Sequence, residues 1–452
     1  MIQSSQVGET PALSQTFASF SANLKIQDVP KDAVANAKLA ILDCFGVSLL
    51  AVSQEAGRAL LRLADQENWN GPCRIWGSET CASSRDAAFA NGTLAHALDY
   101  DDGGHASTYL LAAAMAMAER NDASGKTLLE AFIVGREVRM ALEPVFADRF
   151  EGVGPGARGW HANGIFGPIA AACSAGRVLG LDTPHLLHAI GLAAGSCGAL
   201  GRDGGTLAKP FRAGQAAATG VTCALLAAEG FTGDEEVLQG PYGLLSAIGP
   251  VNESILTALG KNLGREYDLS KNGVKVKNIA AGARAHAPVE AVLRLIQKRP
   301  ISALEVITVE CDIHPFPLLR LNPKRGHEGR FSMAYCLSVA LLLGRLEPTD
   351  FTDELVQDQR VQTLMRSVRH NPGSKALSVM LKNGEKLTEP IVAASELSQW
   401  EQVADKFTQC VRATLTEGQR LSVIEQVGHL EELTSVKTLA GSLRPRPGDK
   451  TV

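Results

Sequence analysis

The chain has 452 residues, of which 45% are apolar and 20% are charged, and its formal net charge is -4. This balance is that of an ordinary globular protein, without the basic excess that nucleic-acid binding requires, so nucleic acid is excluded as a partner. A single hydrophobic core stops growing well below this length, so two domains are expected.

The nine cysteines stand singly, with no CxxC pair and an odd total. We therefore expect reduced thiols, with neither a disulfide framework nor a zinc ribbon. The first residues lack a basic segment followed by an apolar core, and no apolar run reaches the roughly 18 residues of a membrane span. These features predict a cytoplasmic protein that does not bind a membrane.

The first 267 residues are predicted to be predominantly helical. Between residues 30 and 52 apolar side chains recur at intervals of three and four, the periodicity of an amphipathic helix. A composition rich in alanine and leucine predicts further helices at residues 85–98, 127–142, 164–179, 185–194 and 214–229.

After about residue 267 the texture changes to alternation typical of strands. Apolar residues alternate at 273–279, 304–313 and 377–387, and the last stretch surrounds Asn383-Gly384, a strong hairpin signal. Helices are predicted at 288–297 and 330–343, and residues 398–432 return to helical spacing.

The predicted fold is therefore mainly α. A large helical domain is expected from both ends of the chain, residues 1–267 and 396–452, with a smaller α+β domain inserted at 268–395.

One stretch, NGTLAHALDYDDGGHAS, places three carboxylates, Asp99, Asp101 and Asp102, between His96 and His105. A very apolar run follows, so the stretch is a plausible wall of a buried site. The carboxylates could bind a divalent metal with His105, could act as a base with orienting partners, or could cap the helix that follows.

Three further patches carry groups that could take part in chemistry. His161 lies between a glycine-rich loop and an apolar helix, where a purely structural imidazole is the alternative. Lys209 and Arg212 precede an alanine-rich helix; cations there oppose the helix dipole and call for an anionic partner. Lys277 and His286 are nine residues apart, on a strand and at the next helix start, where solvated charge is the alternative.

The chain has no P-loop, no GxGxxG after a strand, no GxSxG and no HExxH. The patches instead combine cations with imidazoles. This set predicts an enzyme that acts on a polyanionic small molecule by acid–base chemistry, with no cofactor and no metal. Removing a proton next to a carboxylate needs a positioned base and cations to stabilise the enediolate.

Five motifs occur in an order that is recognisable: NGTLAHALDYDDGGHAS, GWHANGIFGPIAAACSAGRVLGLD, TLAKPFRAGQAAATGVTCALLAAEGFTG, KNIAAGARAHAPVEA and GRFSMAYCLSVALLLG. Together they resemble the MmgE/PrpD family, which includes 2-methylcitrate dehydratase, cis-aconitate decarboxylase and iminodisuccinate epimerase. The resemblance covers nearly the whole chain. It implies a helical domain with a smaller α+β lid, an active site between them, and a homodimer.

The resemblance also implies roles for particular residues. His161 would be the proton carrier and His105 a second acid–base group, while Asp99 would set the protonation of its neighbours. Carboxylates of the substrate would be held by Lys209, Lys277, His286 and, as a further candidate, Arg212.

The chain departs from the family pattern at several of these motifs. Gly103 stands where decarboxylase relatives have a hydroxyl residue, and Arg212 replaces a histidine. Ala280 and Gly282 stand where proline and cysteine are frequent. The GWH element and the nine-residue spacing from Lys277 to His286 are closer to the decarboxylase and epimerase branch.

The leading hypothesis is a cofactor-independent lyase, a dehydratase or a decarboxylase, that acts on a citrate- or aconitate-like acid. An epimerase or isomerase of a dicarboxylate, a metal-dependent hydrolase and a non-catalytic protein that binds an organic acid are the alternatives. The sequence leaves the acid open, because discrimination between near-isosteric carboxylates is set by pocket shape.

Overall fold

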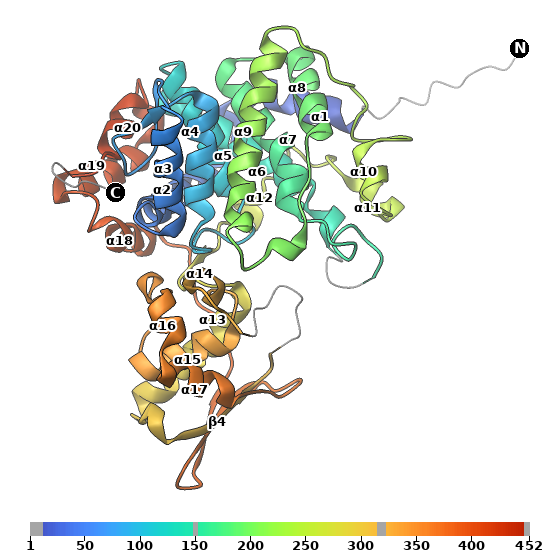
Figure 1. Ribbon diagram of the computed structural model, residues 1–452. Helices are drawn as coiled ribbons and strands as arrows, with labels where there is room; N and C mark the ends of the chain where they lie inside the picture. Colours follow the sequence, from blue (N-terminus) through green and yellow to red (C-terminus); the bar gives the residue numbers. More distant parts are fainter. Residues whose placement is uncertain (1–11, 148–151, 314–321, 447–452) are drawn as a thin grey trace, which may run out of the picture.

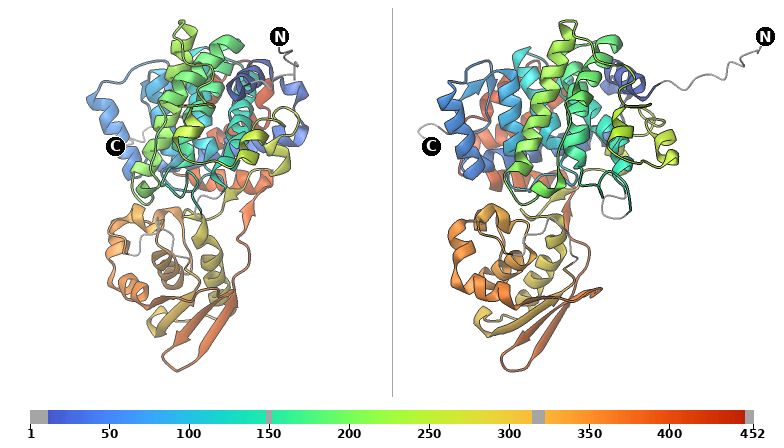
Figure 2. Two further views of the ribbon diagram at one scale, coloured as in Figure 1. Left: turned by 90° about the vertical axis from the view of Figure 1, so that its right-hand side faces the viewer. Right: turned by 45° about the vertical axis from the view of Figure 1, so that its right-hand side comes forward.

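A computed structural model describes residues 12–147, 152–313 and 322–446. Within these ranges the protein is mainly α, as predicted. Two bodies are visible in Figures 1 and 2: a large helical one, and a smaller one below it that contains β4, labelled in Figure 1, and its neighbouring strands. The predicted domain boundaries and the role of the smaller body as a lid stay predictions.

The large body is built from helices of both chain ends. The predicted helices are confirmed as α2 (Lys31–Ala51), α4 (Ser84–His96), α6 (Gly125–Ala141), α7 (Ala162–Leu179), α8 (Thr183–Gly195) and α9 (Ala208–Ala228). The other helices of this body are α1 (Leu13–Asn23), α3 (Glu55–Gln66), α5 (Ala106–Arg120), α10 (Leu244–Ala247), α11 (Glu253–Ala258), α12 (Asp268–Lys271), α18 (Trp400–Val411), α19 (Glu417–Gly428) and α20 (Lys437–Ser442).

Small residues allow the central helices to approach closely. A Cβ on Gly92 of α4 would lie 3.0 Å from the Cα of Gly214 on α9, so the two backbones are almost in contact there. This packing brings the C-terminal end of α4 beside the start of α9. The C-terminal helix α18 packs against α2, far away in sequence, which is visible at the left of Figure 1.

The smaller body contains a four-stranded sheet in the order β5-β4-β6-β7. Its strands are β4 (Val306–Cys311), β5 (Val368–His370), β6 (Ala376–Leu381) and β7 (Lys386–Pro390). β6 and β7 form the predicted antiparallel hairpin around Asn383-Gly384, and β5 is parallel to β4. Its helices are α13 (Ala283–Lys298), α14 (Gly326–Gly329), α15 (Met333–Leu343), α16 (Asp353–Gln357) and α17 (Gln359–Ser367).

Short pairings complete the structure. β3 (Val276–Lys277) pairs with β8 (Glu396–Leu397) where the chain passes between the two bodies, and β1 (Cys73–Arg74) pairs with β2 (Cys81–Ala82). Single 3-10 turns lie at Ile26–Asp28, Glu143–Phe146, Gly201–Asp203, Ala303–Glu305, Pro348–Asp350 and Leu430–Glu432.

Two predicted helix starts are wrong by about one and a half turns. α9 begins at Ala208 rather than residue 214, because Pro210 lies in the first turn, where its missing N–H has no intrahelical acceptor. α13 begins at Ala283 and contains Pro288 inside the helix, so that proline does not mark its start. Lys209 and His286 therefore belong to the helices that they were expected to precede or begin.

α2 is the one helix in the described ranges whose length and hydropathy match those of a membrane span. Most of its residues are buried inside the helical body, where it packs against α4, α5 and α18. All nine cysteines are free thiols, as predicted.

Candidate active site

Residues 98–102, between α4 and α5, form a loop with unusual backbone geometry. Asp99 has a φ of 48° and His105, which precedes α5, has a φ of 67°. Left-handed conformations are rare for residues with a side chain and persist only when the surroundings hold them. We call residues 98–102 the 98–102 loop. Five cations, each from a different part of the chain, contact this loop and hold it in place.

Two ammonium groups converge on the carboxylate of Asp99. Lys209 donates to Oδ1, and Lys277 lies 3.1 Å from Oδ2 while also donating to the Asp99 carbonyl at 2.9 Å. All three side chains are buried. Burial alone would raise the pKa of Asp99, but the two lysines outweigh it and hold that pKa well below its usual value. Asp99 is therefore ionised.

Asp101 bridges two imidazoles. Its carboxylate oxygens lie 2.7 Å from Nδ1 of His105 and 3.2 Å from Nδ1 of His96. Because an ionised carboxylate only accepts, we assign the proton of each ring to Nδ1. Burial lowers the pKa of His105 to about 3, against the opposing charge of Asp101, so the ring is neutral and its Nε2 carries a lone pair.

The free nitrogen of His105 faces the lysine–aspartate pair. Its Nε2 lies 3.5 Å from Nζ of Lys209 and 3.7 Å from Oδ1 of Asp99. The His105 side chain keeps 18% of its surface exposed, whereas His96 is 3% exposed and lies behind it. Of the two imidazoles, His105 is thus the one that a substrate can reach.

His161 is the residue immediately before α7, at the end of the glycine-rich loop as predicted. Its Nδ1 is buried and has no hydrogen-bond partner in the described part of the chain. Burial, and then the charges of Lys209 and Arg212, hold its pKa well below the usual value. Its imidazole is therefore neutral, and Lys209 and Arg212 are the cations whose charges act on it.

The remaining predicted residues differ in how closely they approach the cluster. His286 is joined to it through one carbonyl, that of Ala281, which lies 2.9 Å from His286 Nε2 and 3.5 Å from Nζ of Lys277. Arg212 is half-buried and pairs with Asp203, and burial lowers its pKa to about 10. No contact joins Arg212 to Asp99 in the described residues, so it reaches the site only through its charge on His161.

Three cations that were not predicted hold the back of the 98–102 loop. Arg330 donates to the Leu98 carbonyl at 3.1 Å, Lys406 to the Tyr100 carbonyl at 2.6 Å, and Arg136 to Oδ2 of Asp102 at 2.8 Å. Arg136 is buried on α6 and Lys406 is buried on α18, but both helices carry other charged residues as well. The sequence therefore gives no signal that distinguishes these two buried cations from solvated ones.

Comparison with known proteins gives the family. The MmgE/PrpD N-terminal domain model matches residues 15–254, and the MmgE/PrpD C-terminal domain model matches residues 280–430. The chain belongs to the MmgE/PrpD family.

Similar proteins in this family carry decarboxylase names. Cis-aconitate decarboxylase of Mus musculus is 25% identical, with 96% of this chain and 93% of the relative aligned. The Homo sapiens protein of the same name is 25% identical, covering 96% and 95%. The Aspergillus terreus (strain NIH 2624 / FGSC A1156) protein is 24% identical and covers 93% of each chain.

Among the residues that depart from the family pattern, Gly103 lies closest to the cluster around Asp99. Its N–H donates to the Lys275 carbonyl at 2.7 Å, and Asp102 forms a bridge with Val276. A Cβ at Gly103 would lie 3.4 Å from the Cβ of Lys275, which is ordinary contact. Glycine here removes a side chain beside His105 rather than avoiding a clash.

The cluster also meets the distance criterion for a metal site. One ligand atom from each of His96, Asp99, Asp101 and His105 lies within 4.8 Å of the others. The donor set does not fit a resident divalent ion, because both Nδ1 atoms face Asp101 and two ammonium groups already neutralise Asp99. A divalent ion would be repelled by both lysines.

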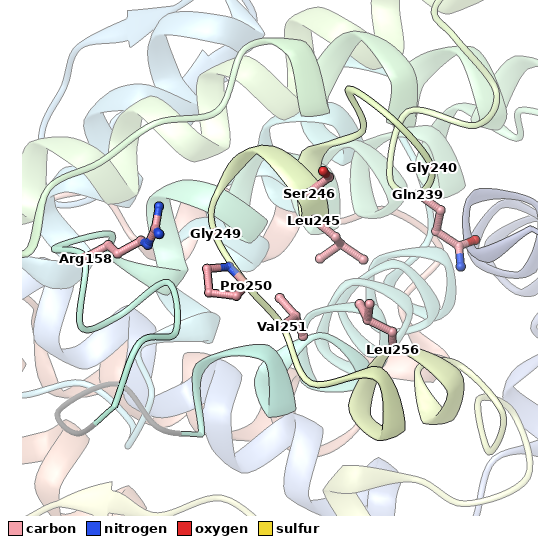
Figure 3. Close-up of a pocket in the computed structure, with 9 residues that line it drawn as sticks. All are labelled: Arg158, Gln239, Gly240, Leu245, Ser246, Gly249, Pro250, Val251 and Leu256. Carbon is pink, nitrogen blue, oxygen red and sulfur yellow. The ribbon is translucent and has the colours of Figure 1, made fainter.

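A roomy pocket lies elsewhere in the helical body (Figure 3). It has a volume of about 520 Å³ and is lined mainly by backbone, glycines and apolar side chains such as Leu245, Val251 and Leu256. Arg158 is the one ionisable side chain among the described residues that line it. A smaller pocket of about 300 Å³ borders the 98–102 loop itself, with Leu98 and Arg330 in its wall.

Proposed function

We propose that this protein is a cofactor-independent lyase that acts on a citrate- or aconitate-like polycarboxylic acid. The reaction moves a proton at a carbon next to a carboxylate and expels carbon dioxide or water. The observation that carries the proposal is the convergence of Lys209 and Lys277 on one carboxylate beside a neutral, oriented His105.

The lysines support a polyanionic substrate. Two buried ammonium groups share Asp99, and the buried guanidinium of Arg330 binds only carbonyl oxygens in the described residues. Such a site is electropositive, and substrate carboxylates are the groups that would complete it. Arg212 adds a positive charge that acts on His161, and His286 is joined to Lys277 through the Ala281 carbonyl.

Acid–base chemistry is assigned to the two neutral imidazoles. His105, with its proton fixed on Nδ1 by Asp101, presents Nε2 as a base. His161 presents a buried Nδ1 without a partner, which can donate or accept a proton at the opposite side of a bound acid. Asp99 holds the side chains of Lys209 and Lys277 in place.

In decarboxylation, the carbon–carbon bond to the departing carboxylate breaks and its electron pair passes into the conjugated system. The enediolate that forms is stabilised by the lysines, and carbon then takes up a proton from solvent, which His105 or His161 relays and carries only during the transfer. In dehydration, a base removes the proton next to a carboxylate and an acid protonates the departing hydroxide. The relatives named cis-aconitate decarboxylase favour the first reaction.

The proposal includes a movable lid in a cytoplasmic homodimer. Asp99 and Lys209 come from the helical body, whereas Lys277 and His286 come from β3 and α13 on the other side of the junction. Movement of the smaller body, which contains the elements from α13 to β7, against the helical body would open the site to substrate.

The test is a substrate panel. Purified protein is incubated with cis-aconitate, citrate and 2-methylcitrate, and products are followed by NMR. We expect loss of carbon dioxide or water from at least one acid. If none is changed and none exchanges protons with solvent, the lyase proposal is wrong.

Three other functions give different results in the same panel. An epimerase would incorporate solvent deuterium without losing carbon dioxide or water. A binding protein would shift the melting temperature with an acid but would leave that acid intact. A metal-dependent hydrolase would lose activity with a chelator, and metal analysis of the purified protein would find a divalent ion.

A further inference from the structure

Lys406 makes contacts that the proposed chemistry does not use. It is 4% exposed on α18, and its Nζ lies 2.7 Å from Oδ1 of Asp43 on α2 and donates to the Tyr100 carbonyl at 2.6 Å. The same ammonium lies 3.7 Å from the centre of the Tyr100 ring. Three segments distant in sequence therefore meet at one buried cation.

The contact between Lys406 and the Tyr100 carbonyl lies between the two functional carboxylates of the 98–102 loop. Tyr100 is the residue between Asp99, which holds the two lysines, and Asp101, which orients His105. Its carbonyl is part of the peptide that joins Tyr100 to Asp101. Fixing that peptide limits the directions in which the two carboxylates can point, and Asp99 is already in a left-handed conformation that its surroundings must hold.

A gain in the free energy of unfolding does not explain why Lys406 and Asp43 form a buried charged pair. Replacing a buried ion pair with well-packed apolar residues is often neutral or stabilising, because desolvating both charges costs about as much as their attraction returns. Burial raises the pKa of Asp43 to about 6 despite the adjacent ammonium, which is the mark of that desolvation. A methionine at position 406 would fill similar space but could not donate to Tyr100.

We propose that Lys406 is a positioning residue: its ammonium fixes the Tyr100 carbonyl so that Asp101 orients His105 and Asp99 orients the two lysines. The inference rests on the proposed function of His105 and deepens it. It assigns a role in the reaction to the C-terminal helix α18, which contributes no group to the substrate side of the cluster.

A matched set of variants separates positioning from stability. Asp43→Asn keeps the donor to Tyr100, Lys406→Met removes it and leaves a buried unpaired carboxyl, and the double variant Asp43→Asn/Lys406→Met removes both charges. Positioning predicts a fall in kcat of about tenfold or more in both Lys406→Met variants, with KM changed less than about threefold. The Asp43→Asn variant should keep kcat within about threefold of the wild type.

The melting temperature is measured on the same four proteins. A structural role predicts that kcat follows the melting temperature, so recovery of both in the double variant would overturn the proposal. The proposal expects the double variant to be more stable than Lys406→Met but equally slow. The double variant also covers the case in which Lys406→Met does not fold.

A readout without substrate keeps this test independent of the proposed reaction. The Nδ1 proton between His105 and Asp101 should give a downfield proton NMR resonance in the wild type and in Asp43→Asn. We expect it to be lost or shifted upfield in the double variant. An unchanged resonance there would contradict the proposal, even if the wild type turned over none of the acids and the proposed function itself had failed.

Discussion

The 98–102 loop and the pocket of Figure 3 differ in the number of charged side chains around them and in the open volume beside them. Around the loop, five buried cations contact Leu98, Asp99, Tyr100 and Asp102, and a pocket of about 300 Å³ borders it. The other pocket offers about 520 Å³ but a single ionisable side chain, Arg158. Small-molecule sites need a few converging polar groups as well as space, so the difference assigns the chemistry to the loop.

The largest effect is expected at His105. A His105→Gln variant keeps a polar side chain of similar reach but has no basic nitrogen, so kcat should fall by a factor of about 10² to 10⁴. Steady-state kinetics with the best substrate of the panel measures it. His188→Gln is the matched control, because that imidazole lies on α8 and contacts the Gly233 carbonyl. Equal rates for both variants would remove His105 from the reaction.

The pH profile should distinguish the buried imidazoles from ordinary ones. Burial lowers the pKa of both His105 and His161, so each remains neutral until the pH falls through that lowered pKa. We expect kcat to stay nearly constant from pH 7.5 down to about pH 5. An imidazole of ordinary pKa would lose about thirtyfold over this range, and such an acid limb near pH 6.5 would contradict the assignment.

A smaller effect is expected at Arg330. Its guanidinium donates to the carbonyls of Leu98, Ala280 and Pro348, and it is stacked on Phe351. Arg330→Met leaves buried carbonyls without donors, which should cost about 1–3 kcal/mol of stability. We expect kcat to fall about tenfold through displacement of the loop. Chemical denaturation and kinetics on one preparation measure both, and an unchanged kcat would limit Arg330 to stability.

The smallest effect is expected in the roomy pocket. Arg158→Ala removes its one ionisable lining side chain and should leave kcat and KM within about twofold, because exposed substitutions away from a site change free energies by about 0.5 kcal/mol or less. A tenfold rise in KM would instead indicate that the substrate binds in that pocket and not at the 98–102 loop.

Periodicity was sufficient to predict the main helices and the hairpin, because each depends on local spacing. α2, α4, α6 and the β6–β7 pair fall within a few residues of their predicted ranges. Helix starts next to proline were less predictable, since Pro210 and Pro288 are compatible with positions inside a helix as well as at its start.

Only the side chains that we expect to face the substrate could be predicted from the sequence. Asp99, His105, Lys209 and Lys277 stand in motifs and meet in space, and the charge of Lys209 also acts on His161. The roles of Asp101 and Asp102 depend on partners that lie on other elements, His96, His105 and Arg136. Long-range pairing of this kind is set by tertiary packing, which is why Lys406 and Arg330 could not be connected to the loop from sequence alone.

The most direct test of the central claim is proton exchange on the substrate. Cis-aconitate, citrate and 2-methylcitrate are incubated with the wild type and with His105→Gln in deuterated buffer, and NMR follows deuterium at the carbon next to each carboxylate together with product formation. For decarboxylation we predict deuterium in the product with the wild type. For dehydration, in which the abstracted proton is not replaced in the product, we predict deuterium in the recovered acid through the reverse reaction. Either signal should be almost absent with His105→Gln. Turnover with deuterium in neither the product nor the recovered acid, or equal incorporation by both proteins, would contradict acid–base catalysis at the 98–102 loop.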